Sequence, residues 1–396
     1  MVRLSQPRLA AVSMAIVFLL AWAALAQSGL RYGVATLVGA LAGFALYHAS
    51  FGFTAGWRRF IRERRGANLR AQLILVGATT VFAIPIIVYG DYVGIAAGGF
   101  VFPFGVAVII GSFAFGLGMQ LGGGCGSGTL FTVGGGSTRM IITLAFFILG
   151  GLLATYHWDF WQQLPKFPAV SLASTPTGPL GAVALTVALL FALALATRRL
   201  EVARHGSLEP AKAMGSLLKG PWSSAAGIAA LTAVGVLTLL VLGRPWGITS
   251  GLTFWGAQIA YQAGVPVGEW SYWKNAMGSV EGSTFGSSTS VMNFGLMAGA
   301  ALAACLAGRY APKLNLSLRD VATAVVGGLL MGYGARIAFG CNIGALLSGI
   351  ASGSLHGWGW FLFAFLGSIA GVRVREFIGM DPPRNTATHG ALRTQT

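Results

Sequence analysis

Residues 111–136 read GSFAFGLGMQLGGGCGSGTLFTVGGG, a segment too apolar for a solvated loop and too rich in glycine for an ordinary helix. Cys125 lies near its centre, with glycines on both sides. A second segment of the same kind, residues 327–352, reads GGLLMGYGARIAFGCNIGALLSGIAS and carries Cys341 at the matching position. We interpret these two segments as the elements around which the chain is organised.

An ungapped alignment that places Cys125 on Cys341 also pairs many other residues. The pairs are Gly111 with Gly327, Gly116 with Gly332, Gly118 with Gly334, Gly124 with Gly340, Gly128 with Gly344, and Leu130 with Leu346. So many paired glycines around one cysteine indicate an internal duplication.

The composition is that of an integral membrane protein. Hydrophobic residues make up 55% of the chain and charged residues 9%, whereas soluble domains carry about 25% charged residues. The mean hydropathy is +0.73. The net charge of +16 comes mainly from arginines in short clusters between apolar runs, which are typical determinants of membrane topology and do not indicate nucleic-acid binding. The three cysteines lie in apolar segments and do not form the framework of a disulfide-rich secreted protein.

The basic clusters predict the topology. The strongest, residues 57–70, is assigned to the cytoplasm by the positive-inside rule. The same side is expected for 198–219, for Arg309, Lys313 and Arg319, and for Arg373 and Arg375. If 30–56 and 247–273 dip into the membrane and return, nine crossings remain, with the N-terminus outside and the C-terminus inside.

The first apolar run, residues 9–26, follows Arg3 and Arg8 and ends in Ala24-Leu25-Ala26, which resembles a signal-peptidase site. The topology favours retention of this segment, because its removal would change the number of crossings.

We therefore predict an all-α integral membrane protein with about nine transmembrane helices and four re-entrant segments. The helices before Cys125 and Cys341 cross in opposite directions, so the duplication is an inverted-topology repeat. Such repeats place substrate sites near the midplane on interrupted segments.

The predicted divisions are a first repeat 1–156 with re-entrant segments 30–56 and 120–138, a linker 157–221 with one transmembrane helix and a basic loop, a second repeat 222–372 with re-entrant segments 247–273 and 338–355, and a cytoplasmic tail 373–396. Tight helix packing through small residues is the alternative explanation of the glycines.

The two cysteines are the main candidates for binding a substrate. Glycine-rich loop tips leave backbone N–H groups free to form an anion-binding concavity, and a thiol there suits a soft anion or, as a thiolate, attacks sulfane sulfur. The candidate site comprises Cys125, Cys341, Gly124, Gly126, Gly128, Gly340 and Gly344. Cys305, within LAACLAG, is interpreted as a small buried hydrophobic residue.

Few polar residues fall within the apolar segments, so each is a candidate. Arg336 precedes Cys341 at the place where Gln120 precedes Cys125. An arginine at membrane depth is costly unless it faces a cavity or a partner, so Arg336 either attracts anions near the outer mouth or extends to the interface. Asn342 and Thr129 are candidate hydrogen-bond donors beside the cysteines.

The sequence lacks the motifs of nucleotide-driven transport, of zinc or haem binding and of serine hydrolases. The sequence contains no GxxxxGK[ST] phosphate loop, no paired His or Cys spacing for zinc or haem, and no GxSxG nucleophile motif. We predict no catalytic residue, no cofactor and no metal.

Four stretches resemble the YeeE/YedE family: GCGSGTL at 124–130, GCNIGALLSGI at 340–350, PWGITSGLTFWGAQIA at 245–260, and TSVMNFG at 289–295. The resemblance implies nine spanning helices with four re-entrant segments in an inverted repeat. It also implies thiosulfate uptake across the bacterial inner membrane, with cysteines passing the anion through S–H···S hydrogen bonds. By this resemblance Cys341 lies at the outer end of the path and Cys125 at its centre.

The sequence departs from the family at one place. The family's thiosulfate transporter has a further cysteine on its first re-entrant segment, and 30–56 has none. Either His48 or Ser50 substitutes for it, or the chain handles a different sulfur species.

The hypothesis from sequence is an inner-membrane importer of a small sulfur-containing anion, with thiosulfate as the leading candidate. Its partners would be the anion, the lipid bilayer and, as a further candidate, a cytoplasmic sulfur-carrier protein, but no nucleic acid. Alternatives are a transporter of another sulfur or selenium species, a membrane thiol enzyme that passes sulfane sulfur from a cysteine persulfide to a cytoplasmic acceptor, and an accessory membrane subunit.

Overall fold

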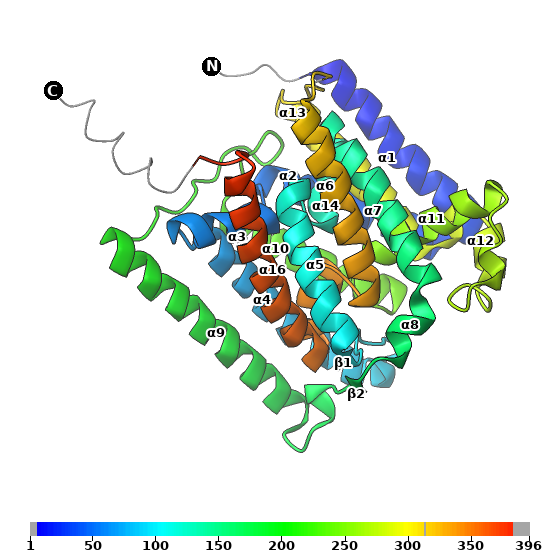
Figure 1. Cartoon of the computed structure of the whole chain (residues 1–396), viewed down its shortest axis with the longest axis horizontal. Coiled ribbons are helices and arrows are strands. Elements are labelled where there is room, and N and C mark those ends of the chain that lie inside the picture. Colours follow the sequence, from blue (N-terminus) through cyan, green and yellow to red (C-terminus); the bar gives the residue numbers. More distant parts are fainter. Residues whose placement is uncertain (1–5, 313, 383–396) are drawn as a thin grey trace.

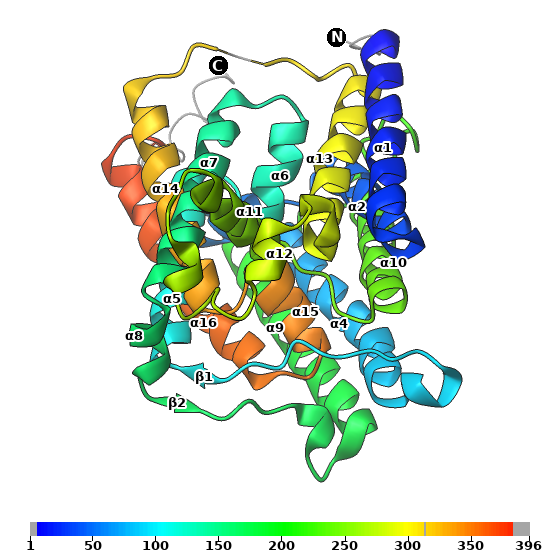
Figure 2. The ribbon, with the colours of Figure 1, turned by 90° about the vertical axis from the view of Figure 1, so that its right-hand side faces the viewer.

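The computed structural model describes residues 6–312 and 314–382, and this part of the chain is almost entirely helical (Figures 1 and 2). It contains ten helical stretches that are long and apolar enough to cross a membrane. The chain is therefore a multi-pass membrane protein. Arg3, Lys313 and most of the predicted tail 373–396 lie outside the described residues.

The elements follow one another as a series of long helices with shorter ones between them. The N-terminal part contains α1 (Pro7–Ser28), α2 (Leu30–Ala49), α3 (Phe53–Glu63), α4 (Ala67–Tyr89), α5 (Val106–Gly122), α6 (Gly126–Gly134), α7 (Thr138–Tyr156), α8 (Trp158–Gln163) and α9 (Gly178–His205). The C-terminal part contains α10 (Ser224–Leu242), α11 (Thr249–Gln262), α12 (Met277–Glu281), α13 (Ser288–Leu306), α14 (Leu318–Ile337), a π-helix (Asn342–Leu347), α15 (Ser348–Ala351) and α16 (Leu355–Phe377). Two short strands, β1 (Phe104–Gly105) and β2 (Lys166–Phe167), pair antiparallel.

Glycines allow the central helices to approach one another closely. A Cβ atom on Gly43 of α2 would lie 1.9 Å from the carbonyl oxygen of Leu296 on α13. Likewise, a Cβ atom on Gly334 of α14 would lie 2.3 Å from the carbonyl oxygen of Gly111 on α5. These positions accept only glycine at the observed helix separation, as in other membrane bundles. Figure 1 shows α5, α14 and α16 side by side within the bundle, with α1 and α9 on its outside.

Most of the basic clusters lie on one side of the bundle, which we call the basic face. Ion pairs join Arg62 to Glu376 at 3.3 Å and Arg70 to Glu201 at 2.7 Å, and Arg319 donates to the carbonyl oxygen of Gly379 at 2.8 Å. The ion pairs link 57–70 to the C-terminal part of α9 and to the C-terminal end of α16, and the Arg319 contact joins the start of α14 to the residues after α16. The prediction that these clusters share one side is confirmed, and its assignment to the cytoplasm stays a prediction.

The segment 30–56 differs from the prediction. Its main part, α2, is a continuous helix of 20 residues, which spans about 30 Å at 1.5 Å per residue. Just before α2, Ser28 donates to the carbonyl oxygen of Phe285 at 3.0 Å; at its other end Trp222 donates to the carbonyl oxygen of His48 at 2.9 Å. The prediction of a dip and return here is wrong, because the glycines of α2 serve close packing and do not interrupt the helix.

The additional helix changes the expected orientation of the N-terminus. The backbone N–H of Gln6 donates to the carbonyl oxygen of Cys305, and its side chain donates to that of Tyr310, both at 3.0 Å. The start of α1 therefore lies beside Arg309. With ten candidate crossings, both ends of the described chain lie on the same side, so the expectation that the N-terminus and the C-terminus lie on opposite sides is wrong.

Candidate functional site

The first cysteine lies where α5 gives way to α6. Gly123, with φ of 90°, ends α5, and Cys125 is the N-cap residue of the nine-residue helix α6. The N–H of Gly128 donates to the Cys125 sulfur at 3.4 Å, and the Ser127 hydroxyl lies 3.5 Å from it. Cys125 is buried. Its thiol is therefore held at a helix N-terminus, where the backbone dipoles favour negative charge. Figure 2 shows α6 between α7 and α13.

The second cysteine follows α14 through an unusual backbone. Phe339 has φ of 57° and Gly340 has φ of 154°, so the backbone departs from the right-handed helical conformation at two successive residues before it reaches Cys341. The next six residues form a π-helix, Asn342–Leu347, a rare element that is frequent at functional sites. Cys341 is fully buried.

The two cysteine segments contact each other. A Cβ atom on Gly126 would lie 3.1 Å from the Cys341 sulfur and 3.6 Å from Cγ2 of Ile248. Ile248 immediately precedes α11, so three segments that are distant in sequence meet at this point. The predicted approach of the two loop tips is confirmed, whereas their part in binding a substrate stays a prediction.

Polar side chains beside the cysteines have no partner within the described part of the chain. The hydroxyl of Thr129 and both polar atoms of the Asn342 amide are buried without a hydrogen bond. Leaving such a group unsatisfied costs about 1–3 kcal/mol. The arrangement is thus suited to a small polar ligand, which would be stabilised by these atoms.

Arg336 and Gln120 occupy matching positions in the alignment, but their surroundings differ. The Arg336 guanidinium lies 5.2 Å from the ring centre of Tyr272 and 5.7 Å from that of Trp158. Gln120 instead donates to the carbonyl oxygen of Thr54 at 3.3 Å, next to the basic face. Of these two residues, Arg336 lies on the side opposite the basic face, where the sequence predicted an attraction of anions, and Gln120 does not.

The proposed substitutes for a third cysteine lie at the end of α2. The His48 ring packs against Phe44 at 4.5 Å and Trp222 at 5.8 Å between ring centres, and Ser50 is the left-handed residue that ends the helix. In the described residues no hydrogen bond or ring contact joins His48 to a cysteine. Cys305 lies 3.8 Å from the hydroxyl of Ser13 on α1 and is buried, as its structural assignment predicts.

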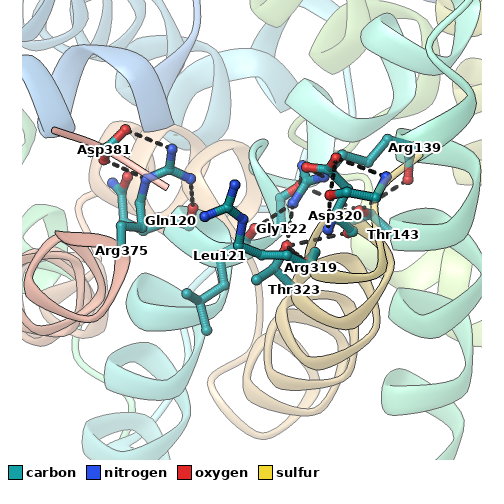
Figure 3. A network of polar contacts seen from close by, with 11 residues as sticks. Gln120, Leu121, Gly122, Arg139, Thr143, Arg319, Asp320, Thr323, Arg375 and Asp381 are labelled. Carbon is teal, nitrogen blue, oxygen red and sulfur yellow. Dashed lines mark hydrogen bonds and ion pairs between the residues drawn. The ribbon is translucent and has the colours of Figure 1, made fainter. Parts of the chain in front are cut away.

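Two arginines that sequence analysis did not place in the candidate site anchor the end of α5 (Figure 3). Arg375 donates to the carbonyl oxygen of Gln120 at 2.8 Å. Arg139 donates to those of Leu121 and Gly122, both at 2.7 Å. The last carbonyls of a helix have no partner within it, and a cation there also opposes the helix dipole. The two arginines thus fix the backbone that leads into the Cys125 segment.

Both arginines are themselves held in place by further polar contacts. Arg139 donates to the Thr323 hydroxyl at 3.0 Å and pairs with Asp320 at 3.8 Å. Arg375 makes two hydrogen bonds to Asp381 at 2.7 and 2.9 Å, which hold the pKa of that carboxyl below its usual range. The sequence contains no signal for this network, because its members come from separate helices and bind main-chain oxygens.

Replacing Arg139 with glutamine should lower the stability of the protein. The change removes charged hydrogen bonds to Leu121 and Gly122, and hydrogen bonds to charged groups contribute about 1.5–3 kcal/mol each. We expect a lower thermal unfolding midpoint for the detergent-solubilised protein. The matched control is Arg199→Gln, which removes an exposed arginine. Equal midpoints for the two variants would contradict the anchoring role.

Comparison with known proteins agrees with these features. Residues 48–370 match a protein family described as Sulphur transport. The chain is 31% identical over 282 residues to the thiosulfate transporter TsuA of Spirochaeta thermophila, an alignment that covers 66% of this chain and 76% of that protein. It is 26% identical over 352 residues to TsuA of Escherichia coli K12, covering 84% and 91%. The probable transporter YedE of Escherichia coli K12 is 34% identical over 149 residues, and the chain spans only 37% of its length.

Proposed function

Because the chain belongs to the Sulphur transport family, we propose that it carries a small sulfur-containing anion, with thiosulfate as the leading candidate, across the bacterial inner membrane. The observation that carries this proposal is the contact between two buried cysteine segments, with a Gly126 Cβ position 3.1 Å from the Cys341 sulfur. The names of the TsuA relatives support thiosulfate in particular.

The same proposal includes an inverted repeat with re-entrant segments. Gly122 and Gly135 lie on either side of the Cys125 segment. The carbonyl oxygen of Gly122 accepts a hydrogen bond from Arg139. A Cβ atom on Gly135 would lie 2.8 Å from Cε2 of Tyr47, near the end of α2. These contacts support a segment that enters and leaves on the basic face. The Cys341 segment returns on the opposite side, where the Ser352 hydroxyl accepts from the N–H of Phe100 at 3.0 Å. Of the four predicted re-entrant segments, 120–138, 247–273 and 338–355 remain part of the proposal.

In this mechanism the thiols act by hydrogen bonding and remain covalently unchanged. Each S–H is a weak donor with a polarisable sulfur, which matches the terminal sulfur of thiosulfate better than an oxygen. The Thr129 hydroxyl and the Asn342 amide, which have no hydrogen-bond partner among the residues that the structure describes, would bind the anion's oxygens. Import of an anion opposes an inside-negative potential at about 2.3 kcal/mol per charge per 100 mV, so uptake requires coupling or rapid consumption inside.

The decisive experiment uses thiosulfate labelled with ³⁵S at either its terminal or its central sulfur. Membrane vesicles that contain the protein should accumulate both labels at equal rates, because the anion crosses intact. A thiol enzyme behaves differently: a thiolate attacks the terminal sulfur, forms a persulfide and releases sulfite. Retention of the terminal label alone, bound to protein, would overturn transport in favour of that activity.

A further inference from the structure

A polar cavity of about 570 Å³ lies on the side of the bundle opposite the basic face. Its lining includes Tyr32, Arg244, Ser250, Tyr272, Ser288 and Thr289. Ser288 begins α13, whose other end lies beside Gln6 on the basic side. With the basic face assigned to the cytoplasm, the cavity lies on the side from which an imported anion would arrive.

Arg244 is the cation of this cavity. Its guanidinium donates to the hydroxyl of Ser288 at 3.3 Å and to that of Thr289 at 3.2 Å. It also lies 5.6 Å from the ring centre of Phe100. Neutral hydroxyls and one aromatic ring fix the position of the guanidinium but do not neutralise its charge.

No carboxylate in the described ranges, 6–312 and 314–382, forms an ion pair with Arg244. Arginines of the basic face differ, since Arg62, Arg70 and Arg375 all have acidic partners. Burial lowers the pKa of Arg244 below its ordinary value. A partly buried cation without a counter-ion is costly, and an anion in the cavity would remove that cost.

The cavity is connected to the cysteine segments through the residues that follow Arg244. The carbonyl oxygen of Trp246 accepts a hydrogen bond from Ser348, just beyond the Cys341 π-helix, at 2.6 Å. Ile248 reaches the Gly126 position, and Tyr272 lines the cavity while it also lies against Arg336. An anion held at Arg244 would therefore be next to the proposed path.

We propose that this cavity is a second anion-binding site, in which Arg244, Ser288 and Thr289 bind the oxygens of a sulfate-like group. A planar guanidinium is well suited to such oxygens, and the first turn of α13 adds a favourable field. The site recognises oxygen atoms, so it binds sulfate as well as thiosulfate. Discrimination by sulfur would then fall to the thiols, a step that rests on the function proposed above.

Isothermal titration calorimetry tests the site by measuring the affinity of the full-length, detergent-solubilised protein for sodium sulfate and for sodium thiosulfate. We expect both anions to bind, and sulfate to bind a Cys125→Ala/Cys341→Ala variant as tightly as the wild type. Arg244→Gln should weaken sulfate binding at least tenfold, Ser288→Ala should weaken it less, and Arg244→Lys should fall between Arg244→Gln and the wild type. Lys274→Gln is the matched control, because it removes an exposed positive charge near the same side.

Two results would overturn the proposal. One is sulfate affinity that is unchanged in Arg244→Gln, with the thermal midpoint used to show that the variant is folded. The other is an equal loss in Lys274→Gln, which would indicate diffuse attraction and no defined site. If Arg244→Gln does not fold, Ser288→Ala decides the question in the same way. The assay contains no transport step, so failure of thiosulfate uptake would leave its outcome unaffected.

Discussion

Alanine in place of Cys125 or Cys341 is expected to abolish growth of a sulfate-uptake-deficient bacterium on thiosulfate as sole sulfur source. Both thiols lie at the contact between the two loop segments, and the Gly126 position is 3.1 Å from the Cys341 sulfur. A methyl group cannot donate a hydrogen bond to the anion, and it leaves the surrounding polar atoms without a ligand. Because a path through a narrow site is only as fast as its slowest step, loss of either thiol should remove transport almost completely.

Cys305→Ala is the internal control, since this third cysteine is buried against α1 and lies 3.8 Å from Ser13. It should support growth at the wild-type rate when membrane expression is equal. Serine at 125 or 341 keeps a hydrogen-bond donor but replaces the soft sulfur with a hard oxygen. These variants therefore show whether transport needs only a donor or needs the sulfur itself. Growth of both alanine variants at the wild-type rate would contradict the proposal that the thiols pass the anion along by hydrogen bonding.

Much of this arrangement follows from the sequence, because the repeated glycines carry geometric information. Gly111 and Gly334 contact each other across α5 and α14, and both belong to the glycine pairs that the alignment identified. The glycines of α2 were not informative in this way: segment 30–56 was predicted to dip and return, whereas Gly39 and Gly43 face α13 within a continuous helix. Glycine permits both a chain break and a close helix contact, and only the partner helix decides between them.

The contact between the two cysteine segments was predictable from the sequence, whereas the residues that support it were not. Cys125, Cys341 and their polar neighbours were selected because loop chemistry is local in sequence. Arg139 and Arg244 were missed for the opposite reason. The former binds main-chain oxygens of another helix. The latter is distinguished from other arginines by having no acidic partner among the described residues, which no sequence pattern records.

Adding a side chain at Gly126 should block transport without removing either thiol. A Cβ atom there would lie 3.1 Å from the Cys341 sulfur and 3.6 Å from its Cβ atom, closer to the sulfur than ordinary contact. The added methyl group would occupy space between the α6 N-terminus and the Cys341 sulfur, so it would narrow the proposed path even where the sulfur rotates to accommodate it. We expect Gly126→Ala to reduce the initial rate of ³⁵S-thiosulfate uptake into vesicles about tenfold, and Gly126→Val to abolish it.

Gly98, which lies outside the candidate site, provides the control. A Cβ atom at this position would meet no atom within 4 Å, so Gly98→Ala should retain most of the uptake rate. A steric block and a folding defect are separated by the thermal unfolding midpoint, which Gly126→Ala should change little, because its new methyl group meets a side chain that can rotate. Since the thiols persist in Gly126→Ala, a normal rate in this variant would show that the anion does not pass between the α6 N-terminus and Cys341, even if both cysteines prove essential.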